Sequence, residues 1–105
     1  MGAARERDDP RPYEREIARY AVGKALRTLG RAGEAATALE QCLAWAAAAG
    51  VEDGYFHEEL AEDYDALGRH AEAREHARRA LELIADGDPA RVRRLRELSG
   101  TTDVR

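Results

Sequence analysis

The sequence is short of the residues that hold many other small proteins together. Its 105 residues include a single cysteine, Cys42, which cannot form a disulfide within the chain. Without a second thiol or a cluster of Cys and His, we expect no disulfide framework, no metal site and no cofactor. This cysteine usage favours a reducing compartment.

Residues that favour β-strands are also scarce, with one Phe, one Trp, four Val and two Ile. All three prolines (Pro10, Pro12 and Pro89) lie near the ends, so residues 13–88 contain no helix-breaking ring. Alanine and arginine, which cost little in a helix, number 22 and 16. The sequence therefore predicts an all-α protein. Its length fits one domain, 1–105, and leaves no room for a large catalytic domain beside a second module.

Long apolar runs are absent as well. The longest, residues 42–49, has eight residues, against the roughly 20 that a membrane-spanning helix needs. The first residues lack the apolar segment of a signal peptide. The net charge of −4 argues against a protein that grips nucleic acid with its whole surface. We expect a soluble, cytoplasmic protein without membrane contact.

Glycines and acidic capping residues divide the chain into five expected helices. The first opens at Asp9 or slightly later, and the last has Asp88 as its cap with Pro89 in its first turn. Glycines follow the helix ends, where they supply the left-handed conformation that closes a helix. The expected helices span about 9–29, 33–49, 54–67, 70–85 and 89–99. We expect flexible tails at 1–8 and 101–105.

A shift of 38 residues aligns the two halves of the chain. Residues 29–35 then fall on residues 67–73, and both segments read Leu-Gly-Arg-x-x-Glu-Ala. The same register pairs Val22 with Leu60, Gly23 with Ala61, and Cys42 with Ala80. The chain is predicted to hold two copies of a helical hairpin, at about 13–50 and 54–86, and one extra helix at about 89–99.

The spacing within each copy resembles the tetratricopeptide repeat, a helical hairpin of about 34 residues with the pattern W-x2-L-G-x2-Y, then A-x3-F, then P. The first copy reads Val22-Gly23-x2-Leu26, then Ala35-x3-Leu39; the second reads Leu60-Ala61-x2-Tyr64, then Ala73-x3-Ala77. Arg19 and His57 stand at the usual Trp position, and the period of 38 is longer than standard.

The resemblance implies a right-handed stack of two hairpins, an α-α superhelix, closed by a C-terminal capping helix. It also implies a non-catalytic scaffold for protein–protein interaction. In this family, small residues mark the points where paired helices approach closely, here Gly23, Ala35, Ala61 and Ala73. The expected core consists of Ile17 or Ala18, Val22, Leu26, Leu29, Leu39, Leu43, Phe56, Leu60, Tyr64, Leu67, Leu81, Ile84 and Leu95.

A concave groove is a further implication, because in this family the first helix of each hairpin lines the surface on which peptides or partner helices lie. On the first helix the candidate contacts form a stripe at spacing three and four, and the third helix carries its counterpart. The candidates are Ile17, Tyr20, Lys24, Arg27, Tyr55, Glu58, Glu62 and Asp65. The family's Lys, Asn and Arg clamp for a terminal carboxylate is not supported, because the chain contains no Asn and the second stripe is acidic.

Two alternatives for this acidic stripe remain open at the sequence level. Residues 52–65 hold seven acids and no Lys or Arg, so the groove could receive a basic or amphipathic segment. Otherwise, stacked helices neutralise one another, with Lys24 and Arg27 facing Glu58, Glu62 or Asp65. Exposed pairs of this kind contribute only about 0.2–1 kcal/mol each.

The remaining motifs favour structural explanations over chemistry. Gly23-Lys24 lacks the other residues of a phosphate-binding loop, and Ala61 stands where a zinc-protease helix would need its second histidine. We expect all three histidines to be surface or hairpin contacts, Cys42 to be a small buried residue, and Trp45 to serve in packing or at an interface. No set of residues predicts an enzyme.

The last helix suggests an alternative function from another class. Arg91, Arg93, Arg94 and Arg96 lie between its apolar positions, and such a patch could touch nucleic acid as an accessory domain of a regulator. Two repeats and a cap are also fewer than the three or so that stack independently. A homodimer, in which uncovered hairpin faces meet, is a further expectation.

Overall fold

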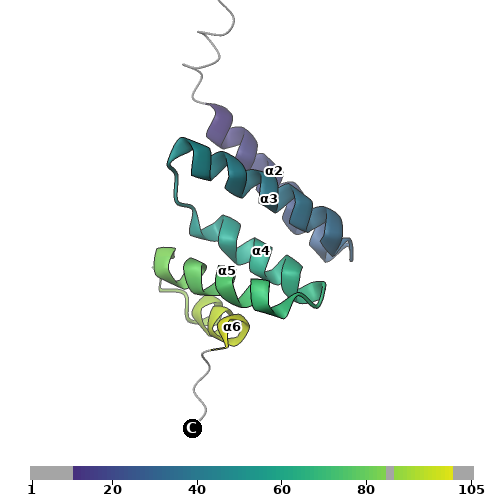
Figure 1. The fold of residues 1–105 in the computed structure, drawn as a ribbon, viewed down its shortest axis with the longest axis vertical. Helices are drawn as coiled ribbons and strands as arrows, with labels where there is room; N and C mark the ends of the chain where they lie inside the picture. The colour runs from purple at the N-terminus through teal and green to yellow at the C-terminus, as the bar shows by residue number, and fades with distance from the viewer. Residues whose placement is uncertain (1–10, 85–86, 101–105) are drawn as a thin grey trace, which may run out of the picture.

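The computed structural model describes residues 11–84 and 87–100, and within these ranges it contains five α-helices and no strand (Figure 1). The helices are α2 (Arg11–Thr28), α3 (Ala32–Ala49), α4 (Gly54–Ala66), α5 (His70–Leu83) and α6 (Pro89–Ser99). The predicted all-α class is confirmed. The tails expected at 1–8 and 101–105 lie outside the described residues.

Local chemistry at the helix ends explains why the helices begin and end close to the expected positions. The Asp53 side chain accepts hydrogen bonds from the amides of Tyr55 and Phe56 at the start of α4, and Asp88 caps α6 in the same way. Gly50 closes α3 in the left-handed conformation, with φ of 71°.

The end of α5 differs from the prediction. The helix stops at Leu83 rather than at residue 85, because Ile84 is extended, with φ of −101° and ψ of 116°. This conformation places the Ile84 side chain, 7% exposed, in a buried cluster with Leu95 and Leu98 of α6.

The helices form two hairpins and a covering helix (Figure 1). α2 packs on α3 and α4 packs on α5; α3 joins the hairpins by packing on α4, and α6 covers α5. A first core cluster lies between the hairpins and includes Leu39, Cys42, Phe56 and Leu60. The family resemblance implied that small residues mark the points where paired helices approach closely. Ala35, Ala61 and Ala73 are each at most 1% exposed.

Part of the expected core is wrong. Four of its residues lie largely at the surface: Ile17 (46% exposed), Val22 (55%), Leu29 (70%) and Leu67 (40%). Ala18, the alternative to Ile17, is exposed too. Ile17 and Val22 belong to α2, the first described helix of the stack, whose outer face has no neighbouring helix among the described residues, and Leu29 directly follows the last residue of α2 in the hairpin turn. Leu67 follows α4 at the hairpin turn.

The other expected core residues are buried or half-buried. Those that are buried are Leu39, Phe56, Leu60, Tyr64, Ile84 and Leu95. Leu26, Leu43 and Leu81 are half-buried, and the latter two pack against the core clusters. The core therefore lies between successive helices rather than on the outer side of α2.

Candidate functional site

The first helices of the two hairpins, α2 and α4, line a hollow of about 440 Å³ together with one side chain from α6. We call this the aromatic hollow; its lining residues are Tyr13, Ile17, Tyr20, Asp53, Tyr55, Phe56 and Arg91. Three of the candidate contacts (Ile17, Tyr20 and Tyr55) lie in it.

Tyr13 fixes one end of the aromatic hollow. Its ring stacks on Trp45 of α3 at a centroid distance of 5.3 Å, and it meets Phe56 edge to face at 6.3 Å. Its hydroxyl donates to Oδ2 of Asp53 at 2.7 Å. This hydrogen bond, together with burial, raises the pKa of Tyr13 to about 12. Asp53 also caps α4. Its carboxylate therefore links Tyr13 of the first hairpin to the start of the second hairpin.

Sequence reasoning missed Tyr13, Asp53 and Arg91 as lining residues. Tyr13 could have been found, since it continues the α2 stripe by one step of four residues before Ile17. Asp53 and Arg91 could not, because they reach the groove through the fold of the α3–α4 loop and through the placement of α6 on α4 and α5.

The middle of the aromatic hollow offers partly exposed aromatic and apolar surface. The Tyr20 ring is tilted against buried Phe56 at 5.8 Å. Burial, with smaller contributions from nearby carboxylates, raises the pKa of Tyr20 to about 12. Ile17 is 46% exposed and Tyr55 38%. A site with aromatic faces and an exposed aliphatic residue is suited to contact with an apolar side chain of a partner.

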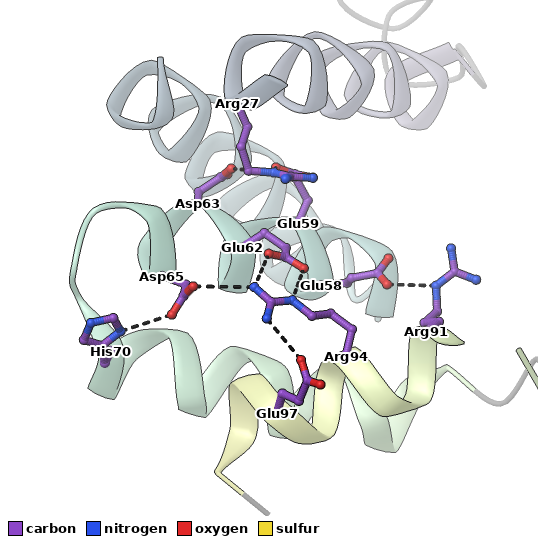
Figure 2. A network of polar contacts seen from close by, with 10 residues as sticks. All are labelled: Arg27, Glu58, Glu59, Glu62, Asp63, Asp65, His70, Arg91, Arg94 and Glu97. Carbon is purple, nitrogen blue, oxygen red and sulfur yellow. Dashed lines mark hydrogen bonds and ion pairs between the residues drawn. The ribbon is translucent and has the colours of Figure 1, made fainter. Parts of the chain in front are cut away.

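The acidic stripe beside the aromatic hollow is paired within the chain (Figure 2). Nε of Arg91 lies 2.8 Å from Oε2 of Glu58, and Nε of Arg94 lies 2.9 Å from Oε2 of Glu62. Arg94 also reaches Oδ2 of Asp65 at 3.5 Å. The neutralising residues therefore come from α6, whereas the sequence-based alternative named Lys24 and Arg27 as the partners.

Arg27 makes a different pair from the expected one (Figure 2). Its Nε and Nη2 donate to the two oxygens of Glu59, at 2.7 and 3.0 Å. Glu59 is 3% exposed, so this contact is far more enclosed than the surface pairs of the acidic stripe.

Asp63 lies beside this pair and is fully buried, with Oδ1 3.6 Å from Nε of Arg27. Neither of its oxygens accepts a hydrogen bond from another group. Burial, followed by the neighbouring Glu59, raises the pKa of Asp63 well above its usual range. This environment therefore favours a neutral Asp63 beside the Arg27–Glu59 pair.

Lys24 is the exposed cation of the groove. Its Nζ lies 5.6 Å from the centroid of the Tyr20 ring, and it makes no ion pair with a carboxylate of the described residues. It lines a small polar cleft of about 130 Å³ next to the aromatic hollow, together with Arg27, Glu58, Glu59, Glu62 and Arg91.

The four arginines of α6 fall into two groups. Arg91 and Arg94 point toward α4 and bind its carboxylates, and the Arg91 guanidinium also lies 5.1 Å from the centre of the Tyr55 ring. Arg93 and Arg96 are exposed. Half of the candidate nucleic-acid patch is therefore engaged inside the fold.

Three further residues from the sequence analysis, Cys42, His57 and His76, lie at contacts between helices. Cys42 is fully buried and donates to the carbonyl oxygen of Glu16 at 3.3 Å; burial is the main cause that raises its pKa to about 12, which disfavours the reactive thiolate. Nδ1 of His57 lies 2.9 Å from Nδ1 of His76 across the α4–α5 contact. Both observations agree with the structural explanations that the sequence favoured.

The described ranges offer neither a metal site nor a membrane-spanning helix. Within residues 11–84 and 87–100, no three His, Cys, Asp or Glu side chains gather in a way that could hold a metal ion. No helix in this part of the chain combines the length and the apolar composition needed to cross a bilayer.

Comparison with known proteins agrees with the hairpin architecture. No curated protein and no solved structure matches the chain. The family profile described as "Tetratricopeptide repeat" matches residues 17–48 and 58–86, which is more than half of the sequence and covers both hairpins. Such repeats generally mediate protein–protein interaction as non-catalytic scaffolds. The chain belongs to the tetratricopeptide repeat family.

Proposed function

We propose that this chain is a non-catalytic protein-interaction module that binds a partner peptide or helix on its concave face, with the aromatic hollow as the main contact. The observation that carries the proposal is the hollow itself. About 440 Å³ of space lies between aromatic walls held in place by the core, and Ile17 and Tyr55 at its surface are substantially exposed. We place the module in the cytoplasm, where the free, buried thiol of Cys42 suits a reducing compartment.

We expect apolar contacts to contribute more to partner binding than electrostatic ones. Glu58, Glu62 and Asp65 are occupied by arginines of α6, so a basic segment would have to displace these pairs before it gained from the acidic stripe. A bulky apolar side chain that enters the aromatic hollow displaces no ion pair. We therefore favour an apolar anchor residue over a basic one as the partner's main contact.

The test is affinity capture from the source cell, followed by binding measurements on the captured partner. The groove variant combines Ile17→Ser and Tyr55→Ser, since both side chains are partly exposed and their loss should leave the fold intact. The control is Leu67→Ser, which removes an exposed apolar side chain that does not line the aromatic hollow. We expect the wild type and the control to retain the partner and the groove variant to lose at least about tenfold in affinity. Equal binding by all three proteins would contradict the proposal.

Nucleic-acid association through Arg91, Arg93, Arg94 and Arg96 remains the alternative function. It has less support, because two of these arginines are engaged with α4 carboxylates. Binding to a generic duplex that weakens steeply with salt and is lost in an Arg93→Ala, Arg96→Ala variant would favour this alternative.

Self-association is a second part of the proposal. The observation that supports it is the exposure of two apolar side chains, Val22 of α2 and Leu29 directly after this helix.

A further inference from the structure

The outer face of α2 carries an exposed, mainly apolar stripe that the groove does not use. We call it the α2 seam; its residues are Arg15, Ala18, Val22 and Ala25 of α2 and Leu29, which directly follows the helix and whose amide still donates to the carbonyl oxygen of Ala25 at 3.0 Å. All five are exposed, and the two largest apolar members, Val22 and Leu29, are 55% and 70% exposed. A shallow hollow of about 370 Å³ lies along its first half, lined by Arg15, Ala18, Arg19 and Val22.

The repeat register shows what kind of surface this is. Shifted by 38 residues, Ala18 and Val22 fall on Phe56 and Leu60 of α4. Those two residues are each 1% exposed, and they lie in the core cluster with Ala36 and Leu39 of α3. In the second hairpin, therefore, this face is covered by a helix. In the first hairpin, nothing in the described part of the chain covers it.

The spacing of the α2 seam suits a second helix of the same sequence. Its residues are three and four apart in alternation, so Val22 and Leu29 share one position of a seven-residue repeat and Ala18 and Ala25 share the other. In an antiparallel pair, Val22 lies opposite Ala25 of the partner subunit, and Leu29 lies opposite Ala18 of the partner subunit. Each large residue thus meets a small one, which allows two helices to approach closely.

The charges on this face select the same arrangement. Arg15 and Arg19 lie in the first half of α2, and no acidic residue belongs to the α2 seam. A parallel pair would bring these arginines next to their own copies. In the antiparallel pair, Arg19 lies opposite Thr28 of the partner subunit, at the negative end of that helix dipole. Arg15 comes next to Arg31 of the partner subunit, whose charge is offset by its own ion pair with Glu34.

We propose that a second copy of this chain covers the α2 seam, so that two molecules pair through antiparallel α2 helices. The inference rests on the self-association part of the proposed function and names its surface. It is independent of the aromatic hollow, which stays open in such a dimer because it lies between α2 and α4. A single helix pair is a small interface, so we expect a weak dimer that dissociates on dilution.

The first experiment is sedimentation equilibrium of the full chain from about 5 to about 500 µM, a range that brackets a micromolar dissociation constant. We expect the mean mass to rise from monomer toward dimer with concentration. Val22→Glu should weaken the dimer at least about tenfold, because it buries a charge in the pairing. Leu29→Glu serves as a second seam variant, and Leu67→Glu, at the equivalent position of the second hairpin, is the matched control. Helical content by circular dichroism checks that each variant is folded.

The second experiment tests the register by disulfide formation in a Cys42→Ala background, which removes the chain's own cysteine. We expect Ala18→Cys and Leu29→Cys proteins to cross-link when mixed. Neither should cross-link efficiently alone, because like positions lie about 16 Å apart in this register.

Three results would overturn the inference. A protein that stays monomeric at every concentration would refute both pairing through the α2 seam and self-association in general. A dimer that persists in both seam variants and gives no mixed disulfide would refute the α2 seam as the interface. Self-association would then use another surface. Equal loss of the dimer in Leu67→Glu would show that the added charge, not the α2 seam, was responsible.

Discussion

Arg27 and Glu59 join the two hairpins through a pair of nearly parallel hydrogen bonds, Nε to Oε2 at 2.7 Å and Nη2 to Oε1 at 3.0 Å. Arg27 comes from α2 and Glu59 from α4, so this contact bridges the helices that line the groove. The geometry matches the fork of a guanidinium to the two oxygens of a carboxylate, which a lysine could not reproduce. The pair thereby fixes how far apart α2 and α4 lie beside the aromatic hollow.

Removing Arg27 should destabilise the protein strongly. In Arg27→Met, the carboxyl group of Glu59 would lose both hydrogen bonds from Arg27 at a 3% exposed position beside Asp63. We expect the free energy of unfolding in urea to fall by about 2–4 kcal/mol, somewhat less than for a fully buried pair because Arg27 is partly exposed. Arg31→Met is the control: its partner Glu34 is on the surface, so we expect little change. Similar losses in the two variants would contradict the importance given to the Arg27–Glu59 contact.

Asp63 should make the protein less stable as the pH rises. Burial raises its pKa in the folded protein above the value of about 3.9 that an unfolded chain shows. The stabilising effect of the bound proton is therefore complete below the unfolded pKa and is lost as the pH rises through the folded one. Asp63→Asn cannot ionise, and its amide can still donate to Glu59. In urea unfolding from about pH 5 to about pH 9, the wild type should lose stability relative to Asp63→Asn. If the stability of the two proteins changed with pH in the same way, the pKa of Asp63 would not be raised.

The His57–His76 contact should make the protein less stable as the pH falls. Burial, followed by the nearby His76, lowers the pKa of His57 from 6.5 to about 4. Burial also lowers the pKa of His76. The contribution of neutral His57 to stability is therefore full above pH 6.5 and is lost as the pH falls toward 4. The lowered pKa of His76 acts in the same direction. His57→Gln should flatten this loss in thermal unfolding at several pH values, whereas His70→Gln, at the surface, should leave it unchanged.

Much of the fold could be predicted from the sequence because its determinants are local. Asp53 and Asp88 accept hydrogen bonds from the first amides of their helices, and Gly50 and Gly100 close theirs in the left-handed conformation. Each of these roles depends on residues within one helical turn. The 38-residue register then predicted that the chain holds two copies of one helical hairpin.

The errors concern contacts between distant parts of the chain. Val22 and Leu29 lie on an apolar helix face, but periodicity cannot show whether a neighbouring helix exists to cover it. Glu59 and Asp63 were not singled out from the sequence, because their burial depends on Arg27 and on the stacking of α4 against the first hairpin. The aromatic hollow likewise needs Asp53 and Arg91, which only the assembled fold brings to the groove.

Gly23 should tolerate no side chain, because α2 and α3 approach closely there. A Cβ at this position would overlap Cδ2 of Leu39, which is fully buried and has little room to move. We expect Gly23→Ala to lower the free energy of unfolding by about 1–3 kcal/mol, despite the better helix propensity of alanine. Gly33→Ala, where a Cβ meets nothing within 4 Å, should be neutral or slightly stabilising. Circular dichroism during urea unfolding measures both, and equal stability of the two variants would rule out close packing at Gly23.

Exchanging the charges of Glu62 and Arg94 tests what the acidic stripe does. The two side chains form a bidentate pair, Nε to Oε2 at 2.9 Å and Nη2 to Oε1 at 3.0 Å, which links α6 to α4. Glu62→Arg alone should lower the free energy of unfolding by about 1 kcal/mol, because like charges then face each other in a solvated setting. Adding Arg94→Glu should restore part of the loss, and a double-mutant cycle in urea gives the coupling energy. If the stripe serves stacking rather than a partner, the exchanged protein keeps its partner affinity; loss of binding with full stability would instead assign Glu62 to the partner.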